Sequence, residues 1–308
     1  MVKPPYSIVV LTWKSADEIP GLVESMDAHL KTEHELIFVD NGSDDGSAEV
    51  ARRLAPHSKV IALDENLGFG AGNNVGVKAA SHDVVVLLNA DTIMLDDSLA
   101  DLAQLARETG AICGPRMLNE DRSLQISAHP PLGSWRQLVS SIWPGALMPD
   151  VVASRCDPWR ADRRAKVGWM AAACIAAPRD LFLRLGPFDE SFDFYGEDID
   201  LAVRADLCGA GNIFAPDVAR IVHIGQRSVS QRFDERQWKL QFETRAWLAR
   251  KNYGRGRAFM DRLAYAIMYG GRWFAKAVLR KPREHDRIYF LAALRGRAHH
   301  HGRASSQS

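Results

Sequence analysis

The feature that most constrains the fold is a run of five apolar residues, 84–88, that ends on two polar side chains. A short, mostly β-branched run of this kind is typical of a strand buried on both faces, as in a parallel sheet. Asn89 and Asp91 follow it, and side chains two residues apart point the same way from an extended backbone. Ligands of open α/β sheets bind beyond the carboxyl ends of the strands, so both residues are expected at the rim of a site. Asp91 then has two interpretations, as a ligand for a hard divalent cation or as a cap on the following turn.

The order of the predicted elements favours an α/β fold with a doubly wound, mostly parallel sheet flanked by helices. Apolar strands alternate with helices, and the strands are expected at residues 6–12, 35–40, 59–63, 84–88 and 111–114. Residues 166–177 are largely apolar and are expected to return to the sheet. Later elements are short strands at 212–216 and 219–223, and helices over 197–208, 231–252 and 259–279.

Charge is distributed unevenly along the 308 residues. From Gln231 to the end there are 18 Lys and Arg against 6 Asp and Glu, whereas the preceding 230 residues carry a net charge of −11. A basic region on an acidic body indicates that this region meets an anionic surface. We therefore divide the chain into a main domain over 1–230, a basic helical region over 231–296, and a disordered tail over 297–308.

The sequence also indicates a compartment. It shows no secretory signal and no apolar run of the ~18 residues that a membrane-spanning helix needs. Its four cysteines form no CxxC pair and are expected to be buried thiols in a reducing environment. We expect a cytoplasmic protein.

A glycine-rich segment over 68–76 suggests a dinucleotide site, but the pattern does not fit one. The dinucleotide fingerprint needs a third glycine where this chain has Asn73, and it belongs after the first strand, not after the third. A dehydrogenase is therefore disfavoured. The loop can still let the backbone approach a diphosphate closely, because glycines have no Cβ.

Several titratable side chains lie at predicted strand ends or at a helix start. Asp40 ends the second strand and His223 ends a late one, while Glu197 and Asp198 begin a helix. Each has an ordinary structural explanation: a cap, a partner of the helix dipole, or a loop histidine. Their convergence with Asp91 on one edge of the sheet would instead indicate a site.

Taken together, these segments resemble the family 2 inverting glycosyltransferases of the GT-A fold, most closely the rhamnosyltransferase branch. The resemblance extends over about residues 6–250, in order and with ordinary spacing. The matching segments are residues 7–13, 39–47, 65–69, 74–76, 88–91, 168–170, 188–192, 197–201 and 223–225.

The resemblance implies a metal and a base. Asp91 matches the last carboxylate of the family's DxD motif and would ligate Mg²⁺ or Mn²⁺, with His223 as a further ligand. Asn89 stands where the motif has its first Asp, which leaves its contact with the metal open. Asp198 would be the general base that takes a proton from the acceptor hydroxyl.

The resemblance also implies a set of substrate contacts. Thr12 and Asp40 would hold the base and ribose of the nucleotide, with Asn66 and Gly68 against it. The full set of substrate-binding residues expected on this basis is Thr12, Trp13, Asp40, Asn41, Asn66, Gly68, Asn74, Asn89, Trp169, Met170 and Glu197.

The expected reaction is transfer of a sugar, rhamnose from dTDP-rhamnose on branch resemblance, to a hydroxyl of a glycan or lipid-linked glycan. Family members often use lipid-linked acceptors, and the basic carboxyl-terminal helices would then rest on an anionic membrane surface. That implies a peripheral location at the inner face of the cytoplasmic membrane, with no nucleic-acid partner. The alternative is a non-catalytic nucleotide-sugar or glycan-binding module on the same fold.

Overall fold

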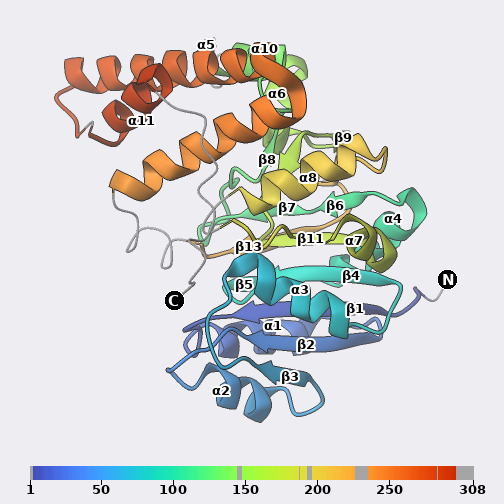
Figure 1. The fold of residues 1–308 in the computed structure, drawn as a ribbon. Coiled ribbons are helices and arrows are strands. Elements are labelled where there is room, and N and C mark those ends of the chain that lie inside the picture. Colours follow the sequence, from blue (N-terminus) through green and yellow to red (C-terminus); the bar gives the residue numbers. More distant parts are fainter. Residues whose placement is uncertain are drawn as a thin grey trace.

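The computed structural model describes residues 3–143, 148–186, 188–192, 196–225, 235–282 and 284–295. Within these residues the centre of the molecule is an eight-stranded sheet of order β3-β2-β1-β4-β11-β6-β12-β9 (Figure 1). In that order the strands are Lys59–Ala62, His34–Asp40, Tyr6–Thr12, Val84–Asn89, Cys174–Pro178, Ile112–Gly114, Asn212–Phe214 and Ala165–Lys166.

The predicted strands form the sheet, and most of their pairings are parallel. β1 lies between β2 and β4 and pairs in parallel with both, whereas β11 pairs antiparallel with β4 and with β6. β11 lies in the segment expected to return to the sheet. Its insertion between β4 and β6 makes the sheet mixed.

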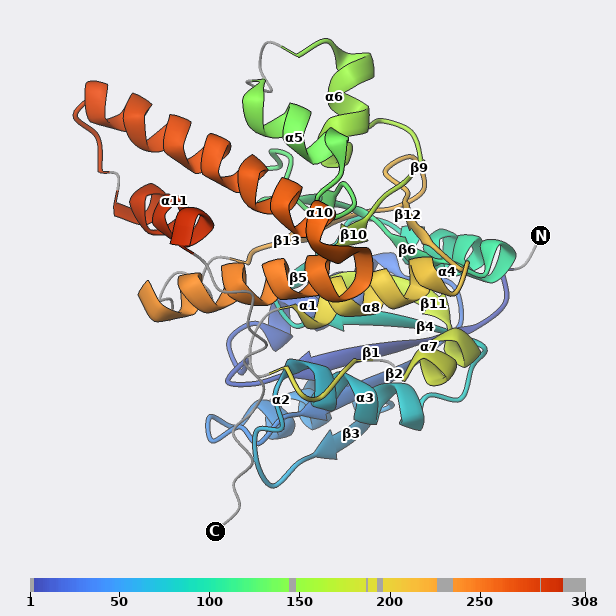
Figure 2. The ribbon, with the colours of Figure 1, turned by 45° about the horizontal axis from the view of Figure 1, so that its top comes forward.

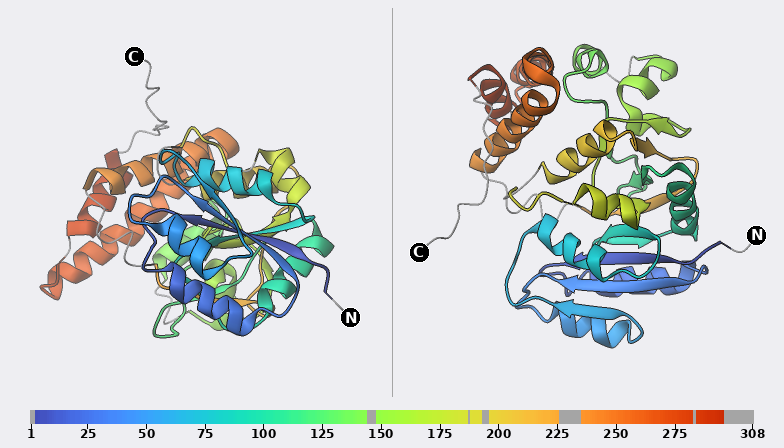
Figure 3. Two further views of the ribbon diagram at one scale, coloured as in Figure 1. Left: turned by 90° about the horizontal axis from the view of Figure 1, so that it is seen from below. Right: turned by 45° about the vertical axis from the view of Figure 1, so that its right-hand side comes forward.

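Helices cover both faces of the sheet (Figure 3), which is why β1 and β4 are apolar at nearly every position. Ile8 and Val10 pack on one face and Val9 on the other. The first face carries α1 (Ile19–His29), α2 (Ser47–Leu54) and α4 (Ser98–Thr109). The second carries α3 (Phe69–Ala79), α7 (Arg179–Leu185) and α8 (Glu197–Leu207).

The glycines of α3 allow this helix to lie close against β1. A Cβ at Gly72 would stand 2.4 Å from the side chain of Leu11, and one at Gly76 would stand 2.1 Å from that of Val9. Real Cβ atoms do not approach so closely. These two glycines of the glycine-rich segment therefore serve helix–strand packing.

Two small sheets extend the domain beyond the main one. β5 (Thr92–Met94), β13 (Arg220–His223) and β7 (Arg116–Leu118) form a three-stranded sheet of order β5-β13-β7. β8 (Ala128–His129) pairs antiparallel with β10 (Trp169–Met170). The first of these sheets brings residues far apart in the sequence to the end of β4.

The carboxyl-terminal helices lie at the end of the molecule opposite β3 (Figure 1). α10 (Glu235–Val278) is bent into two arms, and Gly254 inside it has φ +83° and ψ +179° (Figure 2). A glycine accepts this conformation without the steric cost that a Cβ would bring. α11 (Glu284–Arg295) follows α10. The helices α5 (Trp135–Ile142) and α6 (Asp150–Cys156) and the 3₁₀ turn Pro158–Arg160, from the middle of the chain, lie at the same end of the molecule (Figure 2).

The first arm of α10 packs on the main domain. Leu248 and Ala249 share an apolar cluster with Ile199 and Val203 of α8. The boundary predicted after residue 230 and the tail predicted over 297–308 both lie outside the described residues. In the described parts of the chain, every helix falls short of the length and apolar character needed to cross a membrane.

Candidate active site

Asp91 and His223 meet at the end of β4. In the β5–β13 pairing, His223 lies opposite Thr92, and this register places the imidazole beside the carboxylate. His223 Nε2 is 3.3 Å from Asp91 Oδ1, and the Gly225 N–H donates to Asp91 Oδ2 at 3.1 Å. Gly225 has φ +51°, and a Cβ there would stand 2.9 Å from the His223 ring. The corner therefore requires glycine at this position.

Gln125 fixes the orientation of His223. Its amide nitrogen donates to the backbone carbonyl of His223 at 3.0 Å and to the side-chain oxygen Oδ1 of Asn119 at 3.0 Å, so its own oxygen faces the imidazole. That oxygen lies 2.8 Å from His223 Nδ1 and can only accept, which places a proton on Nδ1. With its proton on Nδ1, the neutral imidazole offers the Nε2 lone pair to a cation beside Asp91, whereas the imidazolium form donates from Nε2 to Asp91. This is the arrangement of a metal-binding histidine with a supporting hydrogen bond.

The Asp91 carboxylate is held ionised. Burial by itself would raise its pKa, but the hydrogen bond and charge of His223, together with the Gly225 N–H, outweigh burial and lower it. An ionised carboxylate oxygen and an imidazole nitrogen side by side fit a divalent cation, and nitrogen suits Mn²⁺ better than Mg²⁺. Among the described residues there is no group of three or more potential ligands. A cation here would therefore take its other ligands from bound phosphates and water.

Asn89 lies at the last position of β4. Its N–H donates to Ala173 O at 2.9 Å, and its carbonyl accepts from Thr92 Oγ1 at 2.8 Å. Asn89 pairs with Leu11 in the β1–β4 register, next to Thr12. The backbone of Asn89 thus shapes the turn that presents Asp91.

Thr12 and Asp40 lie opposite each other at the ends of β1 and β2. Both are buried, and Thr12 Oγ1 donates to Asp40 Oδ1 at 3.1 Å. The N–H and hydroxyl of Ser43 also donate to Asp40, at 3.2 and 2.6 Å. Because β1, β2 and β4 run in parallel, these groups stand at the same sheet edge as Asn89 and Asp91.

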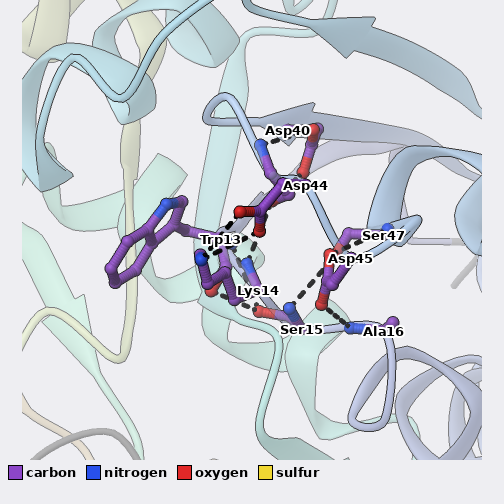
Figure 4. Close-up of polar contacts among 9 residues, drawn as sticks. Trp13, Lys14, Ser15, Ala16, Asp40, Asp44, Asp45 and Ser47 are labelled. Carbon is purple, nitrogen blue, oxygen red and sulfur yellow. Dashed lines mark hydrogen bonds and ion pairs between the residues drawn. The ribbon is translucent and has the colours of Figure 1, made fainter.

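The two loops beyond Thr12 and Asp40 are tied together (Figure 4). Lys14, at φ +52°, forms an ion pair of 2.9 Å with Asp44, and the Ser15 N–H donates to Ser47 Oγ at 2.9 Å. Trp13 precedes them with 36% of its surface exposed, and its ring lies 5.9 Å from the Lys14 ammonium. The ties hold Trp13 at the open side of the loop pair.

Asn41, Asn66 and Gly68 form one hydrogen-bonded cluster next to these loops. Asn41 Nδ2 donates to Asn66 Oδ1 at 2.9 Å and to Gly68 O at 3.1 Å, and Gly68 N donates to Asn66 Oδ1 at 2.8 Å. Asn74 lies apart from this cluster. Its side-chain nitrogen donates to Phe188 O and to the Glu190 carboxylate, both at 2.9 Å, and its oxygen accepts from Phe188 N at 2.8 Å. Asn74 therefore anchors the segment before α8.

Glu197 and Asp198 begin α8 in a poorly solvated place. Burial raises the pKa of Glu197 to about 8, with a further contribution from the charge of Asp198. Among the described residues, buried Glu197 Oε2 has no hydrogen-bond partner. Burial also raises the pKa of Asp198 to about 6. The Ile199 N–H donates to Asp198 Oδ1 at 2.8 Å and partly opposes this rise. Asp198 is therefore mostly ionised at neutral pH and still basic enough to accept a proton. Asp200, by contrast, is paired with Arg204 at 2.6 Å.

Trp169, predicted from the resemblance as a substrate-binding residue, contacts His129 and Arg245, which the sequence did not single out. Its ring stacks on His129 of the paired strand at 3.8 Å, and the Arg245 guanidinium of α10 lies 5.6 Å from it. The positive charge of Arg245 also favours the ionised form of Asp198, and it lowers the pKa of Asp198 by less than burial raises it. Met170, next in sequence, is buried in the core below the sheet. The position of Arg245 in the sequence does not indicate that it lies beside Trp169.

Solved structures identify the fold. The structure of S. aureus TarS 1–349 in complex with UDP-GlcNAc matches with a TM-score of 0.60 at 16% identity, over 94% of this chain and 80% of that one. The mannosyltransferase PcManGT from Pyrobaculum calidifontis, in complex with GDP-Man and Mn²⁺, matches with a TM-score of 0.58 at 19% identity, over 95% and 80%. The protein thus has the GT-A glycosyltransferase fold, which confirms the fold predicted from the sequence.

Sequence comparisons agree with the fold. Residues 7–147 match glycosyl transferase family 2. The N-acetylglucosaminyl-diphospho-decaprenol L-rhamnosyltransferase of Mycobacterium tuberculosis is 27% identical over 234 residues, covering 70% of this chain and 75% of that protein. Residues 7–147 therefore match a glycosyl transferase family 2 domain, and the protein is a glycosyltransferase.

Proposed function

We propose that the protein is a metal-dependent, inverting enzyme that transfers rhamnose from dTDP-rhamnose to a hydroxyl of a lipid-linked glycan. The observation that carries the metal-dependent part is the 3.3 Å approach of His223 to Asp91 from another strand, with Gln125 behind the imidazole. Support for the sugar and the acceptor comes from the mycobacterial relative, whose name specifies rhamnosyl transfer to a diphospho-lipid-linked sugar.

The donor nucleotide would lie along the edge formed by the ends of β1, β2 and β4. Thr12 and Asp40 would contact its base and ribose, and the cluster of Asn41, Asn66 and Gly68 would flank it. Asp91 and His223 would hold Mg²⁺ or Mn²⁺. When bound, this cation offsets the negative charge that develops on the departing diphosphate.

Asp198 would act as the general base. Its carboxylate takes the proton of the acceptor hydroxyl while that oxygen forms a bond to the anomeric carbon. The bond from the anomeric carbon to the diphosphate oxygen breaks in the same step, and its electron pair leaves with the nucleoside diphosphate. Attack opposite to the leaving group inverts the anomeric configuration. Glu197, protonated at neutral pH by its raised pKa, would donate a hydrogen bond to a substrate oxygen.

The second arm of α10 supports a position at a membrane surface. Phe259, Phe274 and Val278 lie on one side of this arm and are 64%, 68% and 67% exposed. Arg280 and Lys281 follow at its end and are also exposed. An apolar stripe next to cationic side chains suits the interface of an anionic bilayer. We propose that this stripe holds the protein at the inner face of the cytoplasmic membrane, near a lipid-linked acceptor.

The test is turnover on a panel of nucleotide sugars with Mn²⁺ and a prenyl-diphosphate-linked N-acetylglucosamine acceptor. The protein should release nucleoside diphosphate, and Asp91→Ala and Asp198→Ala should each remove at least about 99% of the rate. Asp180→Ala is the control, because that carboxylate is exposed on α7 and pairs with Arg184 at 3.6 Å. Unchanged turnover in the first two variants would show that these roles are wrong. Donor binding without turnover on any acceptor would favour the non-catalytic module.

A further inference from the structure

A cavity of about 310 Å³ lies between β8, α5 and the second arm of α10. It is distinct from the sheet edge where the nucleotide is proposed to bind. We call it the α5–α10 pocket, and its walls include Gln137, Ser141, Arg245, Met268 and Tyr269. The volume falls within the range of small-molecule sites and suits one or two sugar rings.

The charges around the α5–α10 pocket are matched within the protein. Arg245 is buried and pairs with the buried Asp261, with nitrogen–oxygen distances of 3.1 and 3.0 Å. Arg272 pairs with Asp286 at 3.3 Å. Burial, with the nearby charge of Arg245, lowers the pKa of His129 to about 3, so this imidazole is neutral. Among the described residues the arginines of the lining are paired, and the lining also holds the Asp157 carboxylate, which accepts from Ser140 Oγ, so the pocket favours a neutral polar ligand over a phosphate.

The lining has the composition of a sugar site. Tyr265 and Tyr269 supply aromatic surface, and Arg245 lies 4.8 Å from the Tyr265 ring. Ser140 and Ser141 of α5 add hydroxyl oxygens that can accept hydrogen bonds, whereas the Gln137 amide is bound to Gly133 and Asp261. Aromatic faces cover the C–H face of a pyranose, and hydroxyls and a neutral imidazole match its hydroxyl groups.

The pocket is joined to the proposed catalytic end of α8 by direct contacts. His129, in its wall, stacks on Trp169, and Arg245, also in its wall, lies 5.6 Å from the Trp169 ring. The indole N–H of Trp169 is buried without a hydrogen-bond partner in the described structure. An unpaired buried donor costs free energy unless a ligand or water satisfies it. Trp169 therefore links the pocket wall to the apolar cluster that holds Ile199 and Val203 of α8, and it carries an unused donor.

We propose that the α5–α10 pocket binds a neutral sugar ring of the acceptor glycan and so positions the acceptor hydroxyl for attack. This inference rests on the proposed function, since it names the acceptor subsite of the same reaction. It makes the carboxyl-terminal helices part of substrate recognition.

The test fills the pocket from two opposite walls. Met268→Trp enters it from α10 and Ser141→Phe from α5, and Ala275→Trp is the matched control because Ala275 is exposed on the same arm of α10. Thermal unfolding first establishes that each variant is folded. Two independent walls keep the test decisive if one variant does not fold.

Two readouts are compared. Saturation-transfer NMR with a panel of methyl glycosides, including methyl β-N-acetylglucosaminide, reports sugar binding without turnover. The two filled variants should lose the signal and raise the acceptor KM at least about tenfold, which is 1.4 kcal/mol, while the donor KM stays unchanged. Ala275→Trp should resemble the original protein in both readouts.

The proposal is overturned if the filled variants retain glycoside binding and acceptor KM, or if the original protein binds no glycoside of the panel. Failure of the proposed function has a different signature. In that case the original protein binds glycosides, the filled variants lose this binding, and no nucleotide sugar is turned over.

Discussion

Replacing Glu197 by Gln should stabilise the protein, and should do so more strongly as the pH rises. In the folded chain burial raises the pKa of Glu197 to about 8, against an ordinary value of 4.5. Between these two values the folded state holds a proton that the unfolded state has released. Stability therefore falls as the pH rises through this window. Glutamine has nearly the same shape and no charge to desolvate, so the variant escapes this loss.

The magnitude follows from the shift in pKa. Because of the shifted pKa, the original protein loses just under ~1 kcal/mol of stability at pH 5 and about 3–4 kcal/mol at pH 7 to 8. Unfolding entropy of about 2.1 cal/mol/K per residue gives roughly 650 cal/mol/K for this chain. The melting temperature of Glu197→Gln should thus exceed that of the original protein by about 5–7 °C at pH 8.

The assay is thermal unfolding of both proteins in a series of buffers from pH 5 to pH 8. Glu49→Gln serves as the control, because Glu49 lies in the first turn of α2 with its side chain 73% exposed. The reasoning is refuted if the gain in melting temperature is the same at pH 5 and pH 8, or if Glu197→Gln melts lower than the original at pH 8.

Three further predictions concern the base, the membrane surface and the bend in α10. The transfer rate at low substrate should rise with pH through about 6 and level off above it, because Asp198 must be ionised, and Asp198→Asn should lower that rate about 10²–10⁴-fold at pH 7.5. Phe274→Glu should abolish co-sedimentation with anionic liposomes without lowering the melting temperature, since the side chain is exposed, and equal binding would exclude the stripe as the contact. Gly254→Ala should cost about 1–3 kcal/mol in chemical denaturation because its conformation suits only glycine, whereas Gly256→Ala nearby should cost nothing.

The sequence was sufficient to predict the first half of the fold. Long apolar runs such as residues 84–88 can be buried only between two layers of helices, so these runs predict both the strands and the helices that cover them. The antiparallel β11 was not predictable as such, because an apolar segment carries no information about the direction of its neighbour. The same is true of β5, whose three residues are too few to show a periodicity.

The contact between Asp91 and His223 in the candidate site depends on a strand, β5, that could not be predicted. Asp91 and His223 were selected from the sequence as strand-end residues, but the register that joins them comes from the short β5–β13 ladder. Gln125 and Arg245 were missed for a related reason. Glutamine and arginine are common surface residues, and only tertiary packing places one behind His223 and the other beside Trp169.

A crystal of the protein soaked with dTDP and Mn²⁺, measured at the manganese absorption edge, tests the central claim most directly. We predict one strong anomalous peak bonded to both the Asp91 carboxylate and His223 Nε2, with the diphosphate completing its coordination. A nucleotide bound at the ends of β1 and β2 with manganese elsewhere, or with no manganese at Asp91, would contradict the proposed mechanism.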